Sequence, residues 1–310
     1  MTASAPLTLA QATAVTRRVT QLSVSVALVL VAAKTAAWLA SGSVAVLASL
    51  ADSGLDLLAS LITLFAVRFA ASPPDAEHRF GHGKAEAFAS LMQGGLVFAS
   101  AALVGREAIA GLMDPRPIQA GGWAMAVMAL SIGLTLALVA AQSRALKQAS
   151  SVAVHGDRAH YAADLASNVA AILGIAGASL LGLYWLDAAA GLVVAAWLVW
   201  GAIGVFREAA GQLMDHELDD DARQRIVALM TEDPAIKGVH QLRTRASGPY
   251  IHIQMHADLD PGLTLVAAHD AMVAAENRVL TAFPTADIII HPDPRGRAEP
   301  HGGAFAETTH

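Results

Sequence analysis

Long apolar stretches with few polar interruptions fill the first two thirds of the chain. A helix that crosses a bilayer needs about 20 mainly apolar residues, and six stretches reach that length. They cover roughly residues 15–40, 43–70, 86–112, 119–144, 158–183 and 187–210. The pattern predicts a membrane domain over residues 13–212, built as an all-α bundle of six transmembrane helices.

The pattern changes after Leu213, where the long apolar runs end and shorter segments with helical or alternating hydrophobic spacing begin. The expected elements are a helix near 219–231, strands at 238–246 and 250–257, a helix at 263–283 and a strand at 286–291. This order predicts a small soluble α+β domain of αββαβ type over residues 213–293, with its helices on one face of a small sheet. The two ends, residues 1–12 and 294–310, are expected to be disordered.

Composition supports a membrane protein and narrows the possible chemistry. Only 15% of the residues are charged, against about 25% in soluble domains. The chain has no cysteine, so imidazole and carboxylate groups are its available metal ligands. A net charge of −6 without a basic patch gives no reason to expect nucleic-acid binding. The first 21 residues lack the pattern of a signal peptide.

Basic residues in the short loops predict the orientation of the spans. Lysine and arginine are enriched in cytoplasmic loops of membrane proteins. Here they gather before the first span, between the second and third, between the fourth and fifth, and at the end of the sixth. Both termini are therefore predicted to be cytoplasmic. Lys34 lies inside the first span, and we expect it to be paired or to extend toward the membrane surface.

Two carboxylates interrupt the second apolar span. Asp52 and Asp56 are four residues apart, so they lie on one face of a helix. The fifth span repeats this spacing with His160 and Asp164. Charged residues in a membrane are costly and need partners.

These four side chains can close a four-coordinate site between two helices. One imidazole and three carboxylates suit Zn²⁺ or a similar first-row ion, whereas Mg²⁺ and Ca²⁺ prefer more oxygen ligands. The alternative is a hydrogen-bond network without metal. An intramembrane metallohydrolase is disfavoured because the His-Glu-x-x-His motif is absent, and no Arg-rich span indicates a voltage-gated channel. We therefore do not expect an enzyme.

These motifs resemble those of the cation diffusion facilitator family. The paired Asp and His/Asp motifs match, and so does the loop that runs His78-Arg79-Phe80-Gly81-His82-Gly83-Lys84-Ala85-Glu86. The likeness covers about residues 14–293 and is greatest to the bacterial zinc/iron exporter branch. It implies a homodimer in the bacterial inner membrane, with a metallochaperone-like (ferredoxin-like) cytoplasmic domain. It also implies that metal leaves the cytoplasm in exchange for protons.

The resemblance assigns three metal sites and one charge pair. The transport site falls on Asp52, Asp56, His160 and Asp164. A loop site falls on Asp75, His78 and His82, for which the alternative is a solvated loop. A binuclear cytoplasmic site falls on His240, His256, His269, His291 and Asp293, with Pro292 where the branch has glutamine. Lys84 and Asp215 resemble a charge interlock between protomers, the alternative being two unrelated interfacial charges.

Other histidines receive no role from the sequence. We expect His252 to be an exposed strand histidine, and we assign nothing to His155, His216, His301 and His310. The predicted function is metal/proton antiport by alternating access, with Zn²⁺ as the main substrate and regulatory ligand and Cd²⁺, Fe²⁺ or Co²⁺ also allowed. The alternative is a metal-binding or metal-sensing membrane scaffold that does not transport.

Overall fold

The computed structural model describes residues 6–41, 44–113, 122–181 and 185–297. Contacts divide the chain into two compact units. The first is Ala10–Met214, and the second joins Asp215–His310 with Met1–Leu9.

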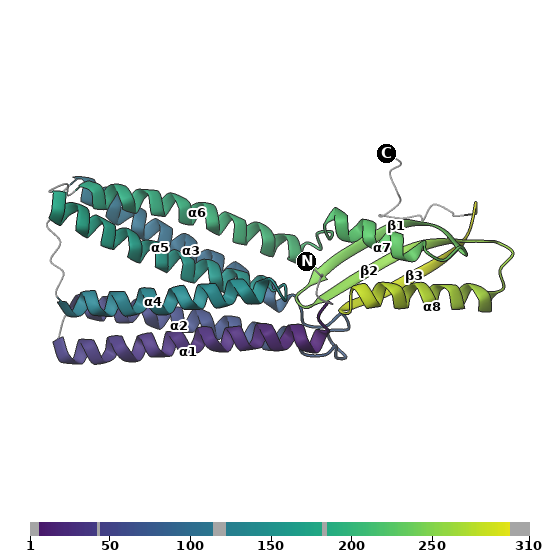
Figure 1. Cartoon of the computed structure of the whole chain (residues 1–310), viewed down its shortest axis with the longest axis horizontal. Coiled ribbons are helices and arrows are strands. Elements are labelled where there is room, and N and C mark those ends of the chain that lie inside the picture. Colours follow the sequence, from purple (N-terminus) through teal and green to yellow (C-terminus); the bar gives the residue numbers. More distant parts are fainter. Residues whose placement is uncertain (1–5, 42–43, 114–121, 182–184, 298–310) are drawn as a thin grey trace. The chain divides into compact units, whose positions relative to one another are not determined.

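The first unit is a bundle of six helices (Figure 1). They are α1 (Leu9–Ser41), α2 (Val44–Ala70), α3 (Ala85–Met113), α4 (Gly122–Leu146), α5 (Val152–Leu181) and α6 (Trp185–Leu213). Among the described residues, five helices are long and apolar enough to cross a membrane, namely α1, α2, α3, α4 and α6. The first half of α5 carries charged residues instead, including Asp157, Arg158 and Asp164. The predicted helical membrane domain is confirmed.

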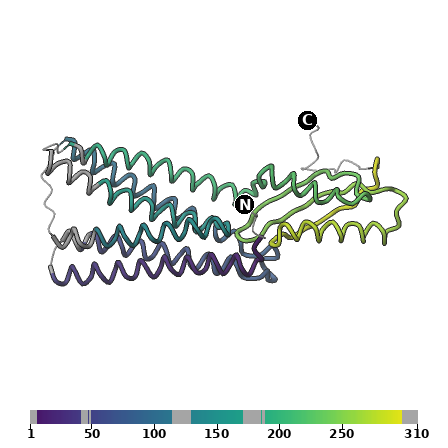
Figure 2. The backbone as a smooth tube through the Cα atoms, viewed as in Figure 1, coloured from purple at the N-terminus to yellow at the C-terminus, as the bar shows by residue number. Residues whose placement is uncertain are grey.

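The helices form two groups that lie apart at one end of the bundle and come together at the other, which we call the shared end (Figure 2). α3, α5 and α6 pack against one another, while α4 and α2 also contact α5. Small residues allow close approach at the shared end, where Ala66, Ala89, Ala145 and Ala153 belong to one buried cluster. Helices in lipid associate through such packing because the hydrophobic effect does not drive them together.

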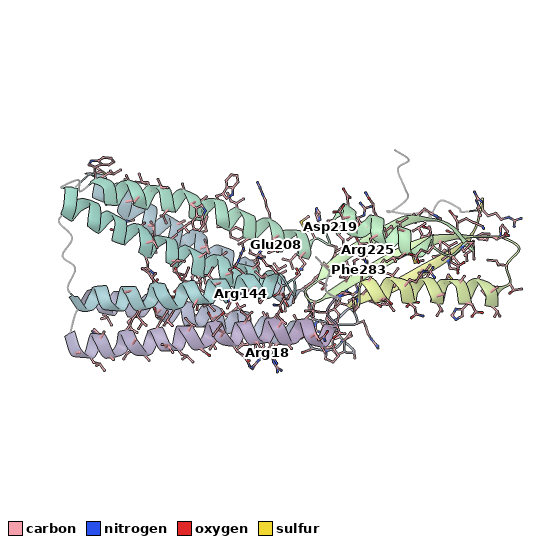
Figure 3. The ribbon with its side chains drawn as sticks, in the orientation of Figure 1. Arg18, Arg144, Glu208, Asp219, Arg225 and Phe283 are labelled. Carbon is pink, nitrogen blue, oxygen red and sulfur yellow. The ribbon has the colours of Figure 1, made fainter. Side chains whose placement is uncertain are left out.

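Charged side chains gather toward that same end of the bundle. Arg18 on α1, Arg144 on α4 and Glu208 on α6 all lie there (Figure 3). This is the end where α1, α3 and α5 begin and where α2, α4 and α6 end. We call it the loop-rich end, and it is the side predicted to be cytoplasmic; that orientation stays a prediction.

The second unit folds as a three-stranded sheet with two helices. Its elements are α7 (Asp220–Met230), β1 (Ile236–Ser247), β2 (Tyr250–Leu259), α8 (Leu265–Ala282) and β3 (Ala286–Pro294). The sheet order is β1-β2-β3, with β1 antiparallel and β3 parallel to β2. Both helices bury apolar residues with one face of the sheet, including Ile226, Ile253, Met255 and Val279. The predicted αββαβ order is confirmed.

Candidate metal centres

A group of ionisable side chains lies between α2 and α5 in the membrane domain. His160 Nε2 is 3.0 Å from Asp56 Oδ1 and 3.7 Å from Asp164 Oδ2. One ligand atom from each of the three residues lies within 4.8 Å of the other two. His160 and Asp164 share a face of α5 because they are one helical turn apart. A cation could replace the contacts among them with coordination bonds.

Asp52 lies one turn before Asp56 on α2 and is exposed. Among the described residues it is not part of the group that brings Asp56, His160 and Asp164 together. Its role as a fourth ligand therefore stays a prediction. Lys34 is paired, because its Nζ donates to Ser53 Oγ at 2.6 Å and to the Ser49 carbonyl at 3.1 Å.

Two buried atoms of the group have no hydrogen-bond partner within the part of the chain that the structure describes. They are His160 Nδ1 and Asp164 Oδ2. Buried polar groups are normally paired, so Asp164 Oδ2 is available to a cation beside His160 Nε2, whereas Nδ1 is the other ring nitrogen and would need a partner of its own. Imidazole nitrogen and carboxylate oxygen are the ligand types that Zn²⁺ and other first-row ions accept.

The same helix carries another ionisable residue, which the motif spacing did not indicate. Asp157 is fully buried and precedes His160 by one turn. The signal was present, because a carboxylate in an apolar span is itself unusual. Its partners, however, lie on other helices and could not be identified from spacing alone.

A second group forms in the loop after α2. Asp75 lies between two histidines, with Oδ1 at 3.4 Å from His78 Nδ1 and Oδ2 at 3.1 Å from His82 Nε2. The imidazole rings of His78 and His82 are 4.7 Å apart. A hydrogen bond from the His78 backbone N–H is the main cause that lowers the pKa of Asp75. The three predicted loop residues are thus close enough to share one cation.

The third group crosses the sheet of the second unit as a row of histidines. His240, His256 and His291 are direct neighbours in register on β1, β2 and β3. Asp293 Oδ2 lies 2.8 Å from His256 Nδ1 and 3.2 Å from His240 Nε2, while its Oδ1 lies 3.4 Å from His291 Nε2. We call these four residues the histidine row.

Charge balance within the histidine row favours an ionised Asp293. Partial burial would raise the pKa of this carboxyl, but the hydrogen bond from His256 and the charges of His256, His291 and His240 lower it overall. Asp258 Oδ2, which the sequence pattern did not indicate, lies 3.6 Å from His240 Nδ1 on the opposite side of the ring. His269 on α8 is exposed and lies outside the group among described residues, so its role as a ligand stays a prediction.

The expectation for His252 was wrong. Its side chain is buried, and its Nδ1 lies 3.3 Å from Asp287 Oδ2. His252 occupies the central strand, where its neighbours on β1 and β3 are Arg245 and Asp287. Strand alternation predicts which face a residue occupies, but it does not predict how far neighbouring strands cover it.

The remaining histidines have various surroundings. His155 forms an ion pair with Glu208, and His216 Nδ1 lies 2.9 Å from the Glu217 carbonyl oxygen. His301 and His310 fall outside the described residues. None of these observations brings a further histidine into the groups above.

The predicted charge interlock was assigned to Lys84 and Asp215. Lys84 Nζ donates to the Leu213 carbonyl at 3.3 Å. Asp215 Oδ2 accepts from Arg245 Nη1 at 3.1 Å. An interlock between protomers stays a prediction.

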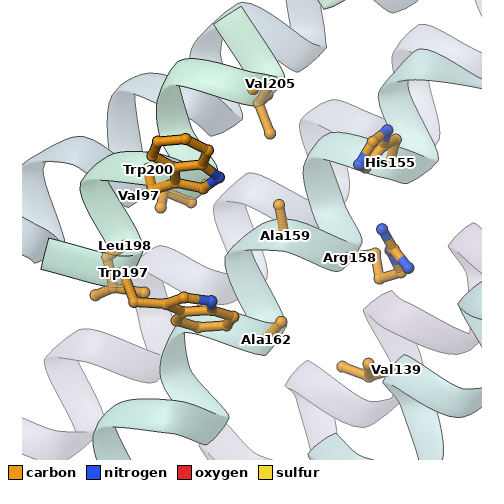
Figure 4. A pocket seen from close by; sticks show the side chains of 12 residues that line it. Val97, Val139, His155, Arg158, Ala159, Ala162, Trp197, Leu198, Trp200 and Val205 are labelled. Atoms are coloured by element: carbon orange, nitrogen blue, oxygen red, sulfur yellow. The ribbon is translucent and has the colours of Figure 1, made fainter. Parts of the chain in front are cut away.

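A cavity of about 430 Å³ lies among α3, α4, α5 and α6 (Figure 4). Its ionisable lining residues are His155 and Arg158, and most of the rest is apolar, including Trp197 and Trp200. It contains no carboxylate in its described lining, so it lacks the ligands that make the three groups suitable for a cation.

Comparisons with known proteins agree with this division into two units. A family model described as the cation efflux transmembrane domain matches residues 20–214. A second, described as the cation efflux protein cytoplasmic domain, matches residues 218–295.

Individual relatives match nearly the whole chain. The cation-efflux pump FieF of Shewanella oneidensis is 41% identical over 272 residues, which cover 88% of this chain and 92% of that protein. The Klebsiella pneumoniae pump of the same name is 40% identical over 258 residues, covering 83% and 86%. The Cronobacter sakazakii pump is 39% identical over 269 residues, covering 87% and 89%.

Proposed function

The chain belongs to the cation efflux family of multi-pass membrane transporters, and we propose that it exports Zn²⁺ from the cytoplasm in exchange for protons. The observation that carries this proposal is the convergence of Asp56, His160 and Asp164 inside the membrane domain. Ionisable residues within spanning helices commonly mark an ion pathway. A bacterial inner-membrane location, with both termini in the cytoplasm, fits this direction of transport.

The ligand types favour zinc as the substrate. Asp56, His160 and Asp164 supply three ligands, and Asp52 or water would supply a fourth. Tetrahedral nitrogen and oxygen coordination suits Zn²⁺, and it disfavours Ca²⁺ and Mg²⁺. Cd²⁺, Fe²⁺ and Co²⁺ accept the same ligands, so coordination geometry and metal supply decide among them.

His160 makes the site sensitive to protons. A histidine ordinarily has a pKa near 6.5, and it must lose its proton before Nε2 can bind a metal. Metal binding from the cytoplasm would then release protons, and protons from the opposite side would displace the metal. Alternating exposure of a site near the middle of the membrane converts this competition into antiport.

The cytoplasmic unit supports a different role for its metals. The histidine row lies on a sheet outside the membrane domain, so its ions are not the transported ones. Binding there could bias a homodimer toward the active state, which is a coupling between separate sites. The loop group, with its exposed Asp75 and His78, would bind metal more transiently.

The second candidate is a metal-binding scaffold that does not transport. The histidine row favours it, because a sensor needs the soluble site. The buried group between α2 and α5 argues against it, since a scaffold has no use for costly membrane carboxylates.

A stopped-flow metal panel on reconstituted vesicles with a pH gradient tests the proposal. We expect zinc flux that depends on the gradient and is lost in Asp56→Ala. Glu107→Gln serves as the matched control, because this exposed acid of α3 lies outside all three groups. Zinc binding without flux in the unmodified protein would favour the scaffold.

A further inference from the structure

Asp157 is a fully buried carboxylate of α5 that the transport site does not use. Its Oδ2 accepts a hydrogen bond from Gln142 Nε2 at 2.8 Å. Its Oδ1 accepts from Gln93 Nε2 at 3.4 Å and from Ser60 Oγ at 3.5 Å. An ionised carboxylate is purely an acceptor, so a set of three donors suits it.

These donors connect Asp157 to four other helices. Gln142 on α4 also donates to Ser23 Oγ of α1 at 3.1 Å. Ser60 on α2 also lies 2.8 Å from the Tyr161 hydroxyl of α5. Gln93 contributes α3. We call this set the Asp157 hub; its members are Asp157, Gln142, Gln93, Ser60, Ser23 and Tyr161.

The Asp157 hub lies between the metal group and the loop-rich end of the bundle. On α2, Ser60 follows Asp56 by one turn toward the end of that helix, and on α5, Asp157 precedes His160 toward the beginning. A buried apolar cluster continues farther toward the loop-rich end and includes Val67 and Ala153. Polar and apolar contacts thus close the bundle on that side of the site.

The opposite side of the metal group is less covered. The Asp164 side chain is 23% exposed, against 6% for His160. Asp52, one turn farther from the hub than Asp56, is exposed. The site is therefore covered toward the loop-rich end, whereas the carboxylates on its other side are more exposed.

Hydrogen bonds to a charged acceptor stabilise this closed arrangement more than neutral ones would. In a membrane there is little water to replace a lost partner. Separating α1, α2 and α4 from α5 at this level would leave a buried charge and its donors unpaired, unless water entered with the separation. A path from the loop-rich end to His160 along α2 and α5 passes between these helices at the level of the hub.

We propose that Asp157 is a positioning residue of the transport cycle. Its hub holds α1 to α5 together on the cytoplasmic side of the site, presents His160 to Asp56, and must open before metal can reach them from the cytoplasm. The inference rests on the proposed transport function only for the direction in which the metal moves.

The natural absence of cysteine allows a direct test of access. Ala27 on α1 is fully buried and lies one turn beyond Ser23, away from the loop-rich end. In an Ala27→Cys parent, the rate of labelling by a membrane-impermeant maleimide is measured from the cytoplasmic face of inside-out vesicles. Asp157→Asn preserves the shape of the side chain but removes one acceptor oxygen.

We expect Asp157→Asn to accelerate labelling from the cytoplasmic face by about tenfold, as expected for loss of a hydrogen bond to a charged group. Ser143→Ala is the matched control, because Ser143 neighbours Gln142 on α4 but lies outside the hub. Its labelling rate should equal that of the parent. Gln142→Met removes the donor at 2.8 Å and should behave like Asp157→Asn, so a folding defect in one variant leaves the other to decide.

Unchanged labelling in both hub variants would overturn the proposal, as would acceleration only from the opposite face. Zinc flux measured on the same vesicles separates this result from the proposed function. Accelerated labelling in a protein without flux would refute transport and support the hub. Normal flux in the parent with unchanged labelling in the variants would refute the role of the hub alone.

Discussion

His160 Nε2 and Asp56 Oδ1 lie 3.0 Å apart, although 104 residues separate them in the chain. The contact joins α5 to α2, so the group exists only while these helices stay packed. A shift of either helix by a fraction of a turn would change the ligands offered to a cation. Helix movement can therefore control both the affinity of the site and the side from which it is reached.

The histidine row should govern how the protein responds to cytoplasmic zinc. A His240→Ala/His256→Ala double variant removes two neighbouring imidazoles and leaves Asp293 without them. We expect loss of the activation of flux by rising cytoplasmic zinc, measured in vesicles, with membrane-site binding retained. His216→Ala is the control, since His216 lies outside the row. Unchanged activation in the double variant would count against a regulatory role.

Metal binding to the histidine row should weaken as the pH falls from 7.5 to 5.5. The pKa of Asp293 lies below its ordinary value of 3.8, so this carboxylate stays ionised from pH 7.5 to 5.5. A metal binds only to unprotonated imidazoles, so proton competition in that window lowers the zinc affinity of the row. Calorimetric titration with zinc at several pH values measures this loss of affinity, and a flat profile would contradict the account.

The lowered pKa of Asp293 also affects the stability of the metal-free protein. A depressed carboxyl pKa contributes stability that is present above the unfolded value and is lost as pH falls through the folded value. The contribution of Asp293 should therefore persist down to about pH 4. An unfolding titration of Asp293→Asn beside the unmodified protein checks this, because the difference between them should vanish only in stronger acid.

The loop group should depend on Asp75 more than on neighbouring acids. Asp75→Asn removes the charge between His78 and His82, and we expect the zinc bound per chain at equilibrium to fall by about one ion. Glu77→Gln changes an exposed acid of the same loop outside the group and should have no such effect. Equal binding by both variants would indicate a solvated loop.

Periodicity along the chain was sufficient to predict most of the fold. Apolar runs longer than 20 residues leave few alternatives to spanning helices, and the alternating segments around His240 and His256 pair as expected. These signals depend only on residues that are close together in the chain, so a single sequence is enough to detect them. The four-residue spacing of His160 and Asp164 likewise placed both on one side of α5.

Contacts between distant segments could not be predicted in the same way. Asp157 draws its donors from three other helices, and no spacing within α5 specifies them. Asp258 reaches His240 at a place where the β1–β2 register shifts just after His240. Burial of His252 likewise follows from strands on both sides of it.

Close packing of α3 against α5 should be sensitive to one glycine. A Cβ added to Gly156 would lie 3.1 Å from Gln93 Cβ and 3.2 Å from Ser90 Cα. Gly156→Ala should therefore destabilise the membrane domain by about 1–3 kcal/mol. At Gly133 on α4 an added Cβ meets nothing within 4 Å, so Gly133→Ala is the control. Thermal unfolding in detergent measures the stability of both variants. Equal stability of Gly156→Ala and Gly133→Ala would contradict close packing of α3 against α5 at Gly156.

Simultaneous recording of zinc and proton flux in vesicles tests the central claim most directly. The unmodified protein should move zinc one way and protons the other, and His160→Ala should abolish both, since it removes the nitrogen ligand of the membrane group. His155→Ala, on the same helix but outside the group, should retain them. Wild-type zinc flux with proton counterflow in His160→Ala would contradict the account.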